Sequence, residues 1–193
     1  MANVNSPFGL SPVKDAYGRP WSGSLEVMTT TTGDGTAIGI GDPLLALGTS
    51  TTNADGTITK DVKIAATTDV IEGVCVAVIP DLSTSLIYRA ASTVRRLLVC
   101  TDPQALFEVQ EGTGGTALTA ADLGLNISLA IGSPSTTTGK SGATIDNSTE
   151  ATTNTLAMKL MGVSSRPNNA IGDSCVWLVK INRSRYADQL AGL

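Results

Sequence analysis

The chain has 193 residues, a net charge of −4 and no histidine, and only 16% of its residues are charged. The missing histidine excludes Ser-His-Asp and Cys-His nucleophile pairs and His-ligated zinc. The acidic balance and the scattered Lys and Arg residues leave no basic patch of the kind that nucleic-acid binding requires. The length fits one domain, or one domain plus an arm, and the abundance of Thr, Ser and Gly favours short strands joined by turns.

The first 24 residues predict an extended N-terminal arm. The stretch FGLSPVKDAYGRPWSG combines aromatic residues, Gly and Pro without an apolar period of 2 or 3.6. Pro7, Pro12 and Pro20 bias the residues before them toward extended structure and interrupt any helix. We therefore expect residues 1–24 to make few core contacts.

Ten segments after the arm show the alternation of a β-strand and are bounded by Gly, Pro, Asn or Asp. They span residues 24–29, 37–47, 57–66, 70–80, 85–90, 95–100, 106–111, 126–132, 155–163 and 174–182. A helix of one or two turns is predicted only at Thr119–Gly124, with a short helix or a frayed tail at the C-terminus. The pattern predicts an all-β fold, a jelly-roll-like sandwich or barrel over residues 25–186, with a C-terminal tail over 187–193.

The three cysteines lie inside apolar strand patterns. Cys75 and Cys100 each sit in an apolar run, and Cys175 shares one strand face with Trp177. The number is odd and no C-x-x-C spacing occurs, so we expect reduced, buried thiols. No signal peptide or membrane span is visible, and we expect the protein to fold in a reducing cytoplasm.

No motif predicts catalysis, a cofactor or a metal site. TGKSG at Thr138–Gly142 resembles the end of a phosphate-binding loop, but Pro134 replaces the required Gly and no helix follows. SPVK at Ser11–Lys14 has the letters of a serine nucleophile motif without its helix or partner motifs. The Asp residues lie at turns and form no calcium loop.

Several stretches together resemble the capsid decoration, or cement, proteins of tailed phages. They are PFGLSPV followed by GRPWSG, then DPQALFEVQ, LGLNISLAIGSPSTTTGKSGATIDNST and NNAIGDSCVWLVKINRSRY, in this order along most of the chain. The resemblance implies a jelly-roll or barrel fold and a non-enzymatic virion protein, made in the host cytoplasm, that binds the outside of an icosahedral head. Its implied partner is a major capsid protein of the HK97-like type, which it would bridge as a homodimer or homotrimer.

In this interpretation the arm carries the partner interface, with Phe8, Tyr17 and Trp21 as aromatic anchors. Packing of Trp21 onto the protein's own β domain is the alternative for that residue. Two other functions stay open. One is another virion part, such as a tail, fibre or connector protein, and the other is a carbohydrate-binding module or an enzyme. No nucleic acid, membrane, metal or cofactor is expected as a partner.

Overall fold

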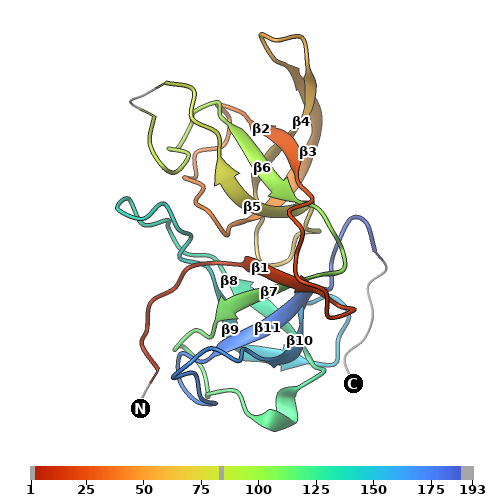
Figure 1. Cartoon of the computed structure of the whole chain (residues 1–193), viewed down its shortest axis with the longest axis vertical. Helices are drawn as coiled ribbons and strands as arrows, with labels where there is room; N and C mark the ends of the chain where they lie inside the picture. The colour runs from red at the N-terminus through yellow and green to blue at the C-terminus, as the bar shows by residue number, and fades with distance from the viewer. Residues whose placement is uncertain (1–2, 83–84, 188–193) are drawn as a thin grey trace.

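A computed structural model describes residues 3–82 and 85–187, and Figure 1 shows its two sheets, one above the other. The described residues form eleven strands in two sheets and a single short 3-10 turn at Ala120–Asp122. The prediction of an all-β fold is therefore confirmed, as is the single helical turn at Thr119–Gly124. Most of the predicted C-terminal tail lies outside the described residues.

The first sheet has six strands and occupies the lower half of Figure 1. Its strands are β1 (Ser11–Asp15), β7 (Ala105–Gln110), β8 (Asn126–Ala130), β9 (Thr144–Ala151), β10 (Met158–Val163) and β11 (Val176–Ile181). They follow the order β1-β7-β11-β10-β8-β9, and each neighbouring pair is antiparallel. The chain supplies β1 first and the other five strands only after it has completed the second sheet.

The second sheet closes into a barrel in the upper half of Figure 1. It contains β2 (Glu26–Thr30), β3 (Pro43–Thr52), β4 (Ile58–Ile64), β5 (Gly73–Val78) and β6 (Arg96–Cys100), in the order β2-β4-β3-β5-β6. The pairing of β2 with β4 is parallel, and the other four pairings are antiparallel. Closure leaves the barrel without a free edge strand.

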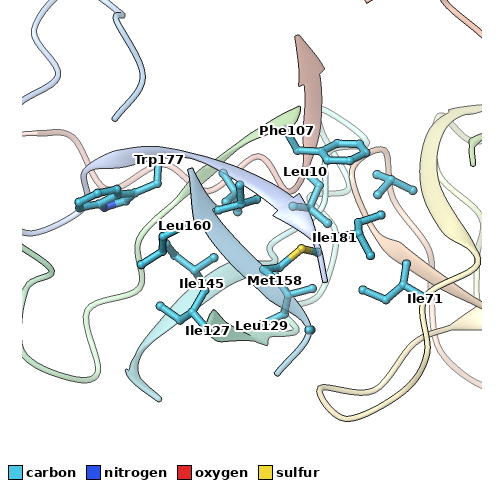
Figure 2. Packing of buried hydrophobic residues seen from close by; sticks show 14 of the residues in the cluster. Leu10, Ile71, Phe107, Ile127, Leu129, Ile145, Met158, Leu160, Trp177 and Ile181 are labelled. Atoms are coloured by element: carbon cyan, nitrogen blue, oxygen red, sulfur yellow. The ribbon is translucent and has the colours of Figure 1, made fainter. Parts of the chain in front are cut away.

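The buried apolar residues form two clusters, and the larger one, called here the larger core, is built mainly by alternating residues of the six-stranded sheet. Trp177 and Val179 of β11 are fully buried, as are Phe107 and Val109 of β7, and Figure 2 shows this packing around Met158. The Trp177 indole N–H donates to the buried carboxylate of Glu111 over 2.9 Å, which satisfies its one polar atom. The prediction of reduced, buried cysteines is confirmed, because all three are buried and free of disulfides.

The N-terminal segment, defined here as residues 3–24, is not the free arm that the sequence predicted. β1 pairs with β7, and Leu10 is 1% exposed within the larger core. Trp21 packs partly buried against the same core, which is the alternative stated above for this residue. No local pattern predicted this docking, because it depends on neighbours that are distant in sequence.

Two strand predictions were wrong. Residues 85–90 form no strand. Arg89 makes only an isolated β-bridge, to Ile38, and its side chain is fully buried and bound by loop carbonyls. Its guanidinium donates to the backbone oxygens of Asp34, Thr36, Thr31 and Thr93 over 2.6 to 2.9 Å. Conversely, β9 forms over a Ser-, Thr- and Asn-rich stretch that lacks a strong apolar alternation.

Candidate functional site

The N-terminal segment lies along the six-stranded sheet and is held there by hydrogen bonds. The Asn3 side-chain amide donates to the carbonyl oxygens of Ala170 and Asp173 over 2.8 and 2.9 Å. The Gln110 side chain accepts from the Ser6 N–H and donates to the Val4 carbonyl, at 2.9 and 2.7 Å. The first aromatic residue of the segment, Phe8, is therefore presented from an ordered backbone.

Phe8 is half-buried and lies close to two cationic side chains. The Arg166 guanidinium carbon is 4.5 Å from the centroid of the Phe8 ring, and Lys140 Nζ is 6.0 Å from it. Arg166 also donates from Nε to Glu108 over 2.6 Å, so its charge is compensated. Such cation–π contacts are worth about 0.5–1 kcal/mol at exposed sites and fix the ring in place.

Trp21 ends a small hairpin that begins in β1. The backbone N–H of Trp21 donates to the Val13 carbonyl over 3.2 Å, and the backbone N–H of Asp15 donates to the Arg19 carbonyl over 2.9 Å. The Asp15 carboxylate accepts the N–H groups of Tyr17 and Arg19 at 2.9 Å and pairs with Arg19 Nε at 2.6 Å. The hairpin turns Tyr17 outward, where it is 73% exposed.

Three hollows lie along the N-terminal segment, and each is lined by Phe8, by Trp21 or by both. Phe8 lines a hollow of about 390 Å³ near Arg166 and a second hollow of about 220 Å³ that it shares with Trp21. Trp21 also lines the third, of about 250 Å³, beside Asp15. The structure thus brings Phe8 and Trp21 to one shared hollow, whereas Tyr17 lines none of the three.

Close backbone contacts next to this surface connect the two sheets, and we call them a joint. Leu10 N donates to the Gly41 carbonyl over 2.9 Å, and Ser141 N donates to the Ile40 carbonyl over 2.8 Å. Gly9 has a φ of +71°, and a Cβ at this position would lie 2.7 Å from the Gly41 oxygen. Only glycine lets the two backbones approach this closely.

Asp42 is the buried charge of this joint. Its carboxylate accepts the Gly39 N–H over 2.7 Å and a short hydrogen bond from the Ser141 hydroxyl. Burial raises the pKa of Asp42 to about 6, although both of these donors favour the charged form. No Lys or Arg forms an ion pair with it within the described part of the chain.

A larger hollow, of about 580 Å³, lies elsewhere, beside β3 and the C-terminal part of the chain. The buried carboxylate of Glu72 accepts from Lys60 Nζ at 3.0 Å and from the Tyr186 hydroxyl at 2.5 Å, and pairs with Arg185 Nε at 2.8 Å. Burial acts to raise the pKa of Glu72, but these partners outweigh it and the pKa lies below its usual value. The chemistry is that of a compensated ion-pair network that ties Arg185 and Tyr186 to the barrel.

Sequence reasoning missed the two cationic neighbours of Phe8. Lys140 stands in the TGKSG loop, which was assessed only as a phosphate-binding motif, and Arg166 stands in an ordinary polar turn. Neither residue carries a local signal that would place it beside a ring more than 130 positions away.

Comparison with models of known protein families, with curated proteins and with solved structures finds no match. Within residues 3–82 and 85–187, no group of three or more His, Cys, Asp or Glu side chains could hold a metal ion. The same residues contain no helix that is long and apolar enough to cross a membrane.

Proposed function

We propose that this protein is a structural component of a phage virion that binds the outer surface of an icosahedral head and cements neighbouring capsomers. The observation that carries the proposal is the ordered aromatic and cationic surface of the N-terminal segment, where Phe8 makes cation–π contacts with Lys140 and Arg166. Aromatic and Arg side chains supply most of the binding energy in protein interfaces. The resemblance of the sequence to decoration proteins supplies the choice of partner, a major capsid protein of the HK97-like type.

The docked state of the segment favours binding. A segment that is already held by Asn3 and Gln110 loses less conformational entropy when it meets a partner than a free arm would lose. Tyr17, exposed at the hairpin turn, is the third proposed anchor. No catalytic step and no cofactor are part of the proposal.

Cementing requires each bound oligomer to contact more than one capsomer. A standard interface buries about 800 Å² per partner, and a homodimer or homotrimer that touches several capsomers gains affinity through effective concentration. Modest single contacts then suffice to hold capsomers together against the pressure of packaged DNA.

The test is co-sedimentation of the purified chain with undecorated heads. Replacing Phe8 and Tyr17 together by Ala is expected to weaken binding about 30-fold, which corresponds to about 2 kcal/mol. Leu123→Ala is the matched control, because Leu123 is an exposed side chain next to the 3-10 turn and lines none of the three hollows.

Two results would contradict the proposal. Full-length protein that stays in the supernatant at every concentration does not decorate heads. Labelled protein that negative-stain microscopy places on the tail or its fibres would assign it to the other class of virion part.

A further inference from the structure

The hollow between Phe8 and Trp21 has the size of a single side chain. Its volume of about 220 Å³ lies below the roughly 300–1,000 Å³ typical of small-molecule sites. The two aromatic residues line it together with a set of mainly apolar side chains, Leu10, Pro12, Ile40 and Val76. An aliphatic side chain would therefore exchange water for apolar contacts on several sides.

The hollow is preformed. Ile40 is fixed by two backbone hydrogen bonds, because its N–H donates to the Gly139 carbonyl and its carbonyl accepts from Ser141 N, both at 2.8 Å. Leu10 is fixed by the bond of its N–H to Gly41, and Val76 belongs to β5 and packs against the larger core. Because the walls are already ordered, binding of a ligand costs little conformational entropy.

One exposed cation lines the same hollow without a carboxylate partner. Lys140 takes part in none of the ion pairs formed among the described residues, whereas Arg166, the other cation near Phe8, is paired with Glu108. In a chain of net charge −4, this uncompensated charge next to an apolar hollow favours an acidic ligand over a neutral or basic one.

We propose that this hollow receives an aliphatic side chain of a partner protein whose neighbouring residue is Asp or Glu, with the carboxylate paired to Lys140. The inference deepens the proposed function, on which it rests only for the identity of the partner. It names the chemistry that the capsid surface has to present, namely an exposed aliphatic residue beside an acidic one.

The experiment titrates the full-length, ¹⁵N-labelled protein with acetyl-Leu-Asp-amide, acetyl-Leu-Asn-amide and acetyl-Leu-Lys-amide. The Asp peptide should shift the amide signals of Ile40 and Val76 and the indole signal of Trp21 in a saturable way. Its affinity should exceed that of the Asn peptide by at least about 5-fold, because hydrogen bonds between charged groups are stronger than neutral ones.

Three variants make the test specific. Lys140→Glu should reverse the order of affinity, so that the Lys peptide binds best. Val76→Phe should fill the hollow and remove binding of all three peptides, with its melting temperature measured to confirm folding. Leu123→Ala, which alters an exposed apolar residue outside the hollow, should leave all affinities unchanged.

Equal affinity for the three peptides, or shifts that cluster away from the hollow, would overturn the inference. So would a Lys140-dependent dimer in sedimentation velocity, because the occupant would then be a second copy. Peptide binding without binding to heads refutes the proposed function and leaves the hollow's specificity standing. Heads that bind Lys140→Glu and Val76→Phe as tightly as the wild type refute this inference alone.

Discussion

Two buried charged residues show how single side chains set the stability of this protein. Asp42 has only uncharged hydrogen-bond donors, so its ionisation is opposed by burial. Arg89 is fully buried, and backbone carbonyls surround its guanidinium. The two predictions at this scale differ in kind, because one depends on pH and the other does not.

Asp42 should make the protein less stable as the pH rises. Its pKa of about 6 in the folded state lies above its ordinary value of 3.8, so the native state binds the extra proton between these two pH values. The contribution of Asp42 is therefore most favourable below about pH 4, falls as the pH rises to about 6, and stays low above it. The total change is roughly 3 kcal/mol.

Asp42→Asn should abolish this dependence, because an amide can accept from Gly39 and donate to Ser141 without a charge. Urea unfolding of both proteins between pH 4 and pH 7.5 measures the difference in free energy of unfolding. If the free energies of unfolding of wild type and variant differ by a constant amount across this pH range, the assignment is contradicted.

Arg89→Lys should destabilise the barrel by about 3 kcal/mol or more, because an ammonium group cannot reach carbonyls on several sides and leaves them buried and unpaired. Arg96→Lys is the control, since Arg96 forms an exposed ion pair with Asp55 at 3.0 Å and should cost less than about 1 kcal/mol. Equal losses in chemical denaturation would mean that the geometry of the guanidinium does not matter.

At the scale of elements, β1 decides how the N-terminal segment behaves. The strand forms the outer edge of the six-stranded sheet, and its neighbour Leu10 enters the larger core. The hairpin that follows covers part of the outer side of β1, through the bond of Trp21 to Val13. The segment is thus part of the folded body and also its most exposed aromatic surface.

Deletion of residues 1–24 should lower the melting temperature, because it uncovers β7 and removes Leu10, whose burial alone is worth about 1.5–3 kcal/mol. Deletion of residues 1–7 keeps Leu10 and β1 and should have a much smaller effect. Differential scanning calorimetry of the three proteins checks this. A melting temperature unchanged by the longer deletion would restore the interpretation of a free arm.

At the scale of the whole molecule, the two sheets are joined twice. One joint links Gly41 and Ile40 to Leu10 and Ser141. The other pairs Ile71 with the chain after β11, through the bonds of Ile71 N to Arg183 and of Arg185 N to Ile71. The larger core includes Ile71, which Figure 2 places next to Ile181. Both sheets therefore share buried surface.

We expect one cooperative unfolding transition, with a calorimetric enthalpy equal to the van't Hoff enthalpy. Gly41→Ala should separate the transition into two, since Gly41 has a φ of +97° and a Cβ would lie 2.8 Å from the Phe8 carbonyl oxygen. Two resolved transitions in the wild type would mean that the joints do not couple the sheets.

The sequence alone determined the local features of this protein. Alternation with period 2 is a property of neighbouring residues, so it identified β7 and β11 and the burial of Phe107, Trp177 and the cysteines. Phe8, Tyr17 and Trp21 could also be recognised from the sequence as candidate interface residues, because the residue type alone identifies an aromatic side chain.

Tertiary structure decided what depends on distant partners. The docking of the N-terminal segment requires β7, the buried position of Arg89 requires carbonyls from residues 31–36, and the hollow at Phe8 requires Lys140. No local pattern encodes such contacts, because a side chain is buried or exposed according to what folds against it. The sequence thus indicated most of the strands and the aromatic residues, whereas long-range packing decided where β1 docks and which side chains form one surface.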